Sequence, residues 1–395
     1  MEVEKLTVKG KLGPLGVKEG EVSLDLRPFT VLVGEQGVGK SLLSQFLYFF
    51  RDAPYLFFKY SSKAPLRGES LTSWIIDRLR SGTATSQSLS SIISTPTVSV
   101  KHEFGGVARS ISIHRERRPR FNPLGSFKKE IERWTQLSVL ESPLQQAVFV
   151  PDERSYYSRL FNTSLSSLGD SATLSIPMLE FTRILELAAG VSVAWQKGEY
   201  VKPPKVQQIE SWAETALKGH AYALEYGSFS KHWVWKSLGS DSVLDIEMIS
   251  SGQKEAWPLI ATLETIFAKK ELSLGNHFSL YVEEPEAHLH PAAQAAMLKI
   301  LVYMVQQGHR VVITTHSLTV LYALNNLIRA SFQSEDAAGW WMPEVRLAPE
   351  DVAAYLLMPD GEVKDIMNRE DGFISEADLA STDEYLSAQF NALLG

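Results

Sequence analysis

The chain has 395 residues, 44% hydrophobic and 22% charged, which is the composition of an ordinary globular protein with room for two or three domains. Its 39 basic and 46 acidic residues give a formal net charge of −7, which argues against a generally basic nucleic-acid coat, and the lack of cysteine excludes disulfides, thiolate metal sites and cysteine nucleophiles. The charged start and the lack of a run of about 18 apolar residues predict neither a signal peptide nor a membrane span, so we expect a soluble, cytoplasmic protein.

The first 150 residues predict an N-terminal lobe that contains an insertion. Alternating apolar residues predict strands within residues 2–34, and the apolar run Phe29–Val33 is typical of a strand that is buried on both faces. A glycine-rich loop and a helix over 41–50 follow. We interpret residues 52–146 as an insertion with a helix over 69–80, a Ser/Thr-rich loop over 81–97, a hairpin of strands 98–104 and 107–114, and a helix over 127–140. A strand at 147–150 completes the lobe.

The remaining chain predicts a helical lobe followed by a lobe in which helices and strands alternate. Residues 151–245 favour helices and loops, and we interpret them as a short helical lobe. In residues 246–395 helices and strands alternate, which predicts a mostly parallel sheet covered by helices, and so an α/β fold. The expected elements are helix 252–268, strand 278–283, helix 291–307, strand 310–314, helix 317–331, a hairpin at Asp360-Gly361 and a helix from about Thr382.

The glycine-rich loop carries the first motif with a chemical meaning. Its sequence G-E-Q-G-V-G-K-S fits G-x-x-x-x-G-K-[ST] and lies between a buried strand and an apolar helix. Backbone N–H groups of such a loop curl around phosphate oxygens, and the following helix directs its positive end at them. We expect Lys40 to reach the β- and γ-phosphates of ATP and the Ser41 hydroxyl to bind Mg²⁺. The predicted ATP-binding residues here are Gly34, Gln36, Gly37, Gly39, Lys40 and Ser41.

A second motif is an apolar strand that ends in two carboxylates. The sequence F-S-L-Y-V-E-E runs from Phe278 to Glu284. In a nucleotide site, Glu283 would help to hold Mg²⁺ and Glu284 would polarise the attacking water. Two alternatives stay open from the residues alone: a solvated acidic turn, and a metal cluster formed by Glu283, Glu286, His288 and His290, although H-E-x-x-H is absent.

Two further motifs flank this strand. Ser250, Ser251, Gly252 and Gln253 precede a helix, and small residues at a helix N-terminus form a second anion site or simply a cap. The run V-V-I-T-T-H-S delivers His316 to the end of a buried strand, where its ring could bond a γ-phosphate or the attacking water.

In this fixed order the four motifs resemble the ABC-type ATPase module of SMC, RecF and OLD proteins, over about residues 1–60 and 245–395. The resemblance implies that they are the Walker A motif, the ABC signature, the Walker B motif and the switch histidine. Val148–Arg154 (V-F-V-P-D-E-R) and Glu283–Pro291 (E-E-P-E-A-H-L-H-P) look like stand-alone OLD/RecF-like bacterial ATPases, a group similar to the ATPase component of phage-defence systems such as PARIS.

The chain departs from the family pattern at several positions. Glu283 stands where Walker B usually has aspartate, Ser251 where the signature often has glycine, and Gln36 where SMC-like loops often have asparagine. No Q-loop glutamine is evident, and the candidates for that position are Gln145, Gln146, Asp152 and Glu153.

The resemblance implies an ABC-ATPase head with a mostly parallel sheet, an antiparallel β subdomain and an inserted helical lobe. It also implies ATP and Mg²⁺ as cofactors, with Glu284 and His316 as catalytic residues and Ser41 and Glu283 at the metal. Heads of this kind pair head to tail, so we expect a dimer or a higher homo-oligomer in which Ser250–Gln253 of one copy face the ATP of the other.

The expected role is that of a sensor or scaffold for a separate effector. Only 79 residues follow His316 and they contain no D-x-D, so we expect the effector, a nuclease in anti-phage defence, to be another protein. One alternative is a RecF-like ATPase that clamps DNA, with the basic run 114–120 on the phosphate backbone. Another alternative is a scaffold that binds nucleotide without hydrolysing it.

Overall fold

The structure is a computed structural model, and it describes residues 3–16, 20–62, 71–79, 95–114, 120–157, 174–226, 230–268, 274–333 and 344–375, together with residue 389. The expected helix from Thr382, residues 115–119 of the basic run and most of the Ser/Thr-rich loop lie outside these residues. No helix in the described ranges is both long and apolar enough to cross a bilayer.

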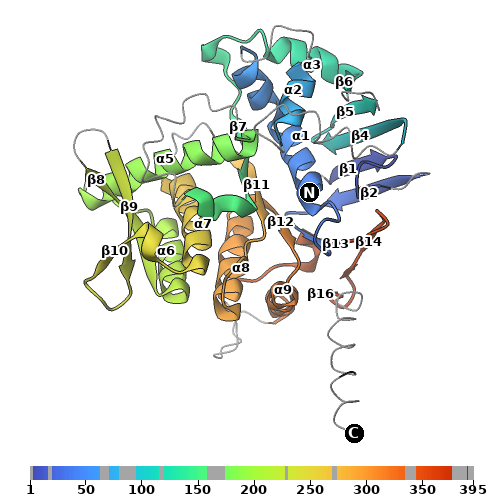
Figure 1. Cartoon of the computed structure of the whole chain (residues 1–395). Helices are drawn as coiled ribbons and strands as arrows, with labels where there is room; N and C mark the ends of the chain where they lie inside the picture. Colours follow the sequence, from blue (N-terminus) through green and yellow to red (C-terminus); the bar gives the residue numbers. More distant parts are fainter. Residues whose placement is uncertain are drawn as a thin grey trace.

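A largely parallel sheet runs through the centre of the molecule (Figure 1). Within the described residues it has six strands in the order β14-β13-β3-β12-β11-β7, and every neighbouring pair is parallel except β13 with β14. All residues of β3 and β13 are buried, as expected for strands covered on both faces. The strands are β3 (Phe29–Val33), β7 (Gln145–Val150), β11 (Leu274–Glu283), β12 (Arg310–Thr315), β13 (Val352–Leu357) and β14 (Val363–Asp365). The predicted strands and the parallel order are confirmed.

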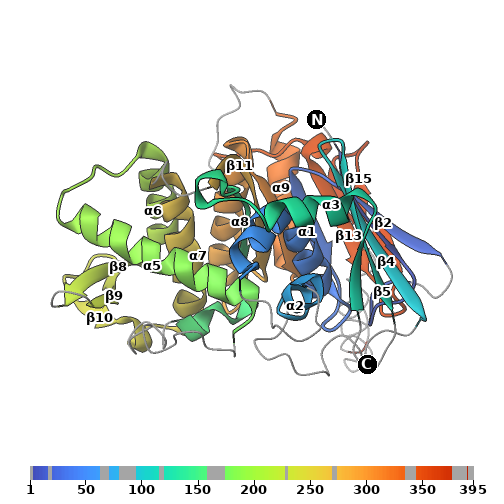
Figure 2. The ribbon, with the colours of Figure 1, turned by 90° about the horizontal axis from the view of Figure 1, so that it is seen from above.

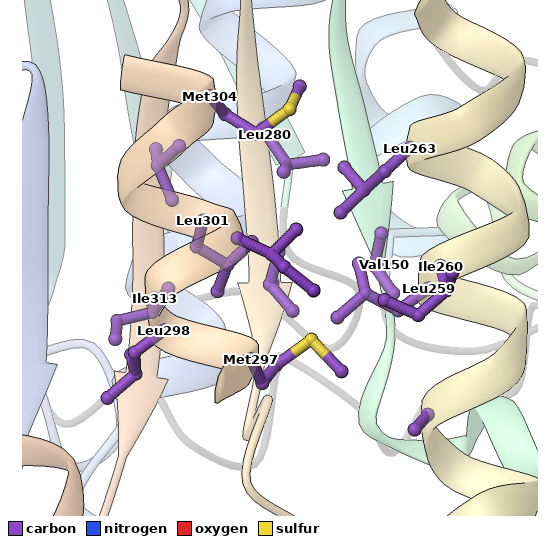
Figure 3. Close-up of a cluster of buried hydrophobic side chains, with 14 of the residues drawn as sticks. Val150, Leu259, Ile260, Leu263, Leu280, Met297, Leu298, Leu301, Met304 and Ile313 are labelled. Atoms are coloured by element: carbon purple, nitrogen blue, oxygen red, sulfur yellow. The ribbon is translucent and has the colours of Figure 1, made fainter. Parts of the chain in front are cut away.

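Helices cover one face of this sheet. They are α5 (Ile176–Gln196), α7 (Ser251–Ala268), α8 (Pro291–Gln306) and α9 (Leu318–Ala330). Figure 3 shows Met297 and Leu301 of α8 beside Leu280 of β11, with Leu259 and Leu263 of α7 opposite them. Successive side chains of a strand point to opposite faces, so Val148 and Val150 enter this core and Ala147 and Phe149 enter the other.

The other face packs against α1 (Lys40–Tyr60). The sequence pattern predicts this helix over 41–50, and Pro54 beyond that range would usually interrupt a helix. The helix instead continues for ten residues, since Ala53, Leu56 and Phe57 stay on its buried face. The predicted insertion at 52–146 therefore begins inside α1, which corrects its boundary.

An antiparallel sheet covers the far side of α1 (Figure 2). In the described part of the chain it has the order β2-β1-β4-β5-β6. It is built from β1 (Glu4–Lys9), β2 (Glu21–Leu26), β4 (Thr97–Phe104), β5 (Val107–His114) and β6 (Arg120–Leu124), with α2 (Leu71–Asp77) and α3 (Ser126–Trp134) beside it. The hairpin at Gly105-Gly106 is confirmed. The helix predicted over 127–140 ends at Trp134, because Ser138 and Glu141 form a capping box that starts a separate short turn.

The lobe predicted to be helical also contains a sheet, which corrects the sequence interpretation. Besides α5 and α6 (Pro204–Leu217), the described residues include β8 (Gly219–Tyr226), β9 (Ser230–Ser237) and β10 (Val243–Asp245). Trp233 and Trp235 alternate on the buried face of β9, and the Trp233 ring lies 4.8 Å from that of Trp257 on α7. The Tyr, Trp and Val residues of β8 and β9 favour strands, a signal that the helical interpretation of this segment missed. The remaining short strands, β15 (Met367–Asn368) and β16 (Phe373–Ile374), pair with each other.

Candidate nucleotide-binding site

Three of the four motifs meet at the carboxyl edge of the central sheet. The register pairs Glu283 of β11 with Thr314 of β12, and Thr315 of β12 with Val33 of β3. Because these strands are parallel and end at paired positions, Gly34, Glu284 and His316, which follow them, all lie at one edge of the sheet. In open α/β sheets this edge is where ligands bind.

The phosphate loop has the backbone shape that its glycines predict. Gly34, Gly37 and Gly39 have φ values of 150°, 84° and 100°, which other residues rarely adopt. A Cβ atom at Gly37 would meet nothing within 4 Å, so the loop leaves open space beside that backbone. Gln36 is exposed on the same loop. The loop therefore presents free backbone at the N-terminus of α1, which is the arrangement that binds phosphate.

Lys40 folds back over this loop. Its Nζ donates hydrogen bonds to the carbonyl oxygens of Gly34 (2.6 Å) and Glu35 (2.8 Å), and the residue is 6% exposed. Burial lowers the pKa of Lys40, while the carboxylates of Glu284 and Glu286 raise it. The ammonium group is thus held at the loop by weak neutral acceptors, which an anionic phosphate can replace.

Glu283 is a buried carboxylate with a free oxygen. It is 3% exposed, and burial raises its pKa to about 8; the nearby Asp152 also raises it, whereas hydrogen bonds from the Ser41 hydroxyl and the Asp152 backbone N–H lower it. Among the described atoms, Glu283 Oε1 has no hydrogen-bond partner. A buried carboxylate oxygen and an adjacent hydroxyl are hard oxygen ligands that suit Mg²⁺, which usually takes only one or two carboxylates from the protein.

The rival metal cluster is not formed. The described residues hold no group of three or more His, Asp or Glu side chains arranged around a common metal position. Glu286 is buried and accepts hydrogen bonds from the Thr315 hydroxyl and the His316 backbone N–H, and His290 caps α8 instead. These contacts occupy His290 and Oε1 of Glu286, while Glu286 Oε2 has no partner among the described atoms. The hydroxyl of Ser41 beside Glu283 is what makes Glu283 the metal candidate.

Glu284 and His316 lie side by side at the mouth of the site. Glu284 Oε1 is 3.3 Å from His316 Nδ1, and both side chains are partly exposed. Glu284 has a φ of 42°, a left-handed conformation that costs a non-glycine residue roughly 1–3 kcal/mol. Its N–H donates to the Thr314 carbonyl oxygen at 3.0 Å. Strain of this kind is kept where the surrounding structure fixes a functional side chain.

The signature residues build a helix cap and do not reach the phosphate loop of the same chain. The Gln253 Oε1 accepts from the Ser250 N–H (3.0 Å) and hydroxyl (3.1 Å), and its Nε2 donates to the Leu217 carbonyl oxygen at the end of α6. Ser250 and Ser251 are exposed. A Cβ at Gly252 would lie 2.6 Å from the His288 carbonyl oxygen, so glycine lets α7 touch the loop after β11.

The register of β7 separates the four candidates for the Q-loop position into two pairs. Gln145 and Gln146 begin β7, at the edge opposite the phosphate loop, and the Gln146 N–H donates to buried Asp52. Asp152 and Glu153 follow the end of β7, at the phosphate edge, and Glu153 borders an open cavity together with Ser251 and His288. The two acids are therefore the candidates that lie on the correct side.

One residue at this edge escaped the sequence analysis as a site residue. Arg154 entered only as the last letter of V-F-V-P-D-E-R, yet its guanidinium is fully buried beneath Glu283 and Glu284 and binds their carbonyl oxygens. A charged residue just after a buried strand and a proline was the available signal, but its burial depends on contacts from 100 residues further along the chain.

Comparison with known proteins points to an ATPase. Residues 183–321, from α5 to the start of α9, match a family model described as an AAA ATPase domain. This range contains Ser250–Gln253, Glu283, Glu284 and His316. Among curated proteins no sequence matches the chain.

Solved structures of SMC heads align over most of the chain at low identity. One SMC head bound to the C-winged helix domain of ScpA is 14% identical over 93% of this chain and 97% of that chain, with a TM-score of 0.44. An Smc head from Pyrococcus furiosus, with an extended coiled coil and bound to the C-terminal domain of ScpA, is 14% identical (93% and 96%, TM-score 0.46), and an SMC head from Thermotoga maritima is 13% identical (93% and 99%, TM-score 0.41). The domain match and the geometry of the phosphate edge together support an ATPase.

Proposed function

We propose that the chain hydrolyses ATP at the carboxyl edge of its central sheet. The observation that carries this proposal is the convergence of the phosphate loop, the buried Glu283 beside Ser41, and the Glu284–His316 pair at one edge. Lys40 holds the phosphates, Glu284 takes a proton from the attacking water, and His316 contacts the γ-phosphate. Ser41 and Glu283 would hold Mg²⁺, which would neutralise charge on the phosphates.

We infer further that two copies share each ATP. Ser250 and Ser251 are exposed, and their hydrogen bonds stay within the cap of α7, so they are available to the nucleotide of another copy. Helix N-termini favour phosphate in this position. The active unit would then be a head-to-tail dimer or a larger ring built from the same contact.

A mixing experiment tests the shared site. Lys40→Ala removes the phosphate-binding half and Ser250→Arg blocks the signature half, so each variant alone should be inactive. Mixed, they can form pairs in which one site is whole, and ATPase activity should return to at most about half per mixed pair if the sites are independent. Light scattering of the Glu284→Gln variant in the presence of ATP measures its oligomeric state. A chain that stays monomeric there, yet turns over normally as wild type, would disprove the shared site.

We also propose that ATP turnover controls a separate effector, a nuclease in anti-phage defence. This step rests on the family resemblance, including that to systems such as PARIS, and not on a particular site. Proteins that co-purify with the Glu284→Gln variant from its native host should include a nuclease. Addition of ATP should change the amount of this nuclease that stays bound to the variant. Metal-dependent DNA or RNA cleavage by the purified chain itself would contradict the assignment. For the DNA-clamp alternative the described residues offer no supporting contact.

A further inference from the structure

Arg154 forms a buried junction between three elements of the site. Its Nη1 donates to the carbonyl oxygens of Pro151 (3.0 Å) and Glu283 (2.6 Å), its Nη2 to that of Glu284 (2.6 Å), and its Nε to that of Glu255 (2.8 Å). These acceptors lie at the end of β7, at the end of β11 and in the second turn of α7. The guanidinium therefore links α7, which begins with the signature residues, to the end of β11, where Glu283 and Glu284 lie.

The chemistry of this contact indicates that Arg154 fixes the conformation of the backbone segments that it binds. The residue is 0% exposed, and among the described residues its one ion-pair partner is the Glu255 carboxylate at 3.7 Å. A buried ion pair of this kind is a poor source of stability, since apolar residues of similar volume often replace it without loss. A rigid planar fork that satisfies four main-chain carbonyls instead fixes the backbone of each segment, which a lysine cannot do equally well.

The backbone that Arg154 fixes most directly is that of Glu284. The strained left-handed conformation of Glu284 is held from both sides: Thr314 accepts from its N–H, and Arg154 donates to its carbonyl oxygen. A change in either contact would let the backbone relax and turn the carboxylate away from its place beside His316.

We propose that Arg154 is a positioning residue that sets the direction of the Glu284 carboxylate and ties it to the position of α7. Because Glu255 lies three residues after Gly252 on the same helix, a nucleotide that draws the α7 N-terminus toward itself also pulls on the Glu284 backbone through one side chain. This inference rests on the proposed ATPase, in which Glu284 polarises the water.

The experiment compares Arg154→Lys with Arg154→Met. Lysine keeps a cation beside Glu255 but cannot reach all four carbonyls, and methionine removes the contacts altogether. We expect steady-state turnover to fall about tenfold for lysine and about a hundredfold for methionine, with the KM and Kd for ATP within about twofold of wild type, because a small misplacement of a reacting group lowers kcat and leaves binding intact.

Arg183→Lys is the matched control. Arg183 lies on α5 at a different contact between lobe and core, beside Tyr55 and Glu180, so its conservative replacement should leave turnover unchanged. Single-turnover rates of Arg154→Lys in the Glu284→Gln background sharpen the test. If Arg154 acts through Glu284, the lysine substitution should lower the residual rate no further.

Each outcome decides the inference. Normal turnover by a folded Arg154→Lys protein overturns it, as does an equal loss of ATP affinity and rate, or a lysine variant that fails to fold, which would make Arg154 purely structural. An additional tenfold loss in the Glu284→Gln background would also overturn it. Failure of the proposed ATPase is a separate result, since wild type and the Lys40→Ala variant would then release phosphate at the same rate.

Discussion

Two buried charges join the lobe to the ATPase core, and they do so by different means. Arg154 binds main-chain carbonyls at the phosphate edge. Glu180 of α5, 3% exposed, accepts from side chains near the end of α1: the Tyr55 hydroxyl at 3.0 Å, Lys59 Nζ at 2.6 Å and the Tyr60 hydroxyl at 2.5 Å. Arg154 joins the segment 151–245 to the C-terminal half of the core, and Glu180 joins the same segment to α1 in the N-terminal half.

The difference lies in what each junction holds still. Side-chain contacts at Glu180 hold two helices together but leave the backbone of each to its own hydrogen bonds. Main-chain contacts at Arg154 fix the conformation of residues that we place in the reaction. We therefore expect damage at the Arg154 junction to appear in turnover, and damage at the Glu180 junction to appear in stability.

The largest expected effect is at the residue that the Arg154 junction serves. Glu284→Gln should bind ATP normally and lose at least about a hundredfold in turnover, because an amide cannot accept the proton of the attacking water. Phosphate release and the binding of a fluorescent ATP analogue check both halves of this statement. Hydrolysis at the normal rate would remove the catalytic reason for the Arg154 contacts.

Next in size is the loss of the charge at the other junction. Glu180→Gln removes the charge that faces Lys59 and turns one of the two acceptor oxygens into an NH2 donor, so part of the bonds from Lys59 and the two tyrosines is lost. The change should cost about 2 kcal/mol in the free energy of unfolding. Denaturant titration measures this cost, and turnover per folded molecule should stay near that of wild type. A selective fall in turnover with stability unchanged would break the comparison.

Glu283 makes the Arg154 side of the molecule sensitive to pH. Burial raises its pKa to about 8, so between pH 4.5 and 8 the folded protein without nucleotide or Mg²⁺ holds a proton that the unfolded chain has lost. Stability contributed by this group therefore falls as pH rises through that window, by about 1.4 kcal/mol per pH unit at the steepest. Unfolding titrations at pH 6 and 7 should show the slope in wild type and a flatter one in Glu283→Gln. Equal slopes would show that Glu283 is ionised in the folded protein.

The smallest effect is expected at the rim of the Glu180 junction. Arg183 is 55% exposed and lies 3.7 Å from Glu180, so its contribution is screened by solvent. Arg183→Ala should change the free energy of unfolding by less than about 0.5 kcal/mol. A loss of stability as large as that of Glu180→Gln would contradict this expectation. It would mean that Glu180 and Arg183 contribute as one unit, whatever the exposure of each side chain.

The sequence was most informative where one segment alone determines the outcome. Gly34–Ser41 and Phe278–Glu284 are continuous motifs at strand ends, and their meeting at one edge follows from parallel order. What could not be predicted depends on distant partners. Pro54 suggests a helix end, but the buried face of α1 overrides it. The place of β9 against α7, where the Trp233 ring meets that of Trp257, likewise depends on a partner outside the strand. Arg154 gains its place only through Glu255 and Glu283, which no local pattern connects to it.

The position of β3 in the central sheet means that this strand must wait for its partners during synthesis. The strand that launches the phosphate loop lies between β12 and β13, so neither of its neighbours exists when it is made. A ribosome adds about 5–20 residues per second, so Phe29–Val33 emerges roughly 15–55 seconds before Arg310–Thr315 is available to pair with it. During this interval a largely apolar strand has both edges unpaired, and it is a natural target for chaperones that bind nascent chains. A nascent chain stalled before residue 310 should be cut by protease within Phe29–Val33, and one released after residue 357 should be protected.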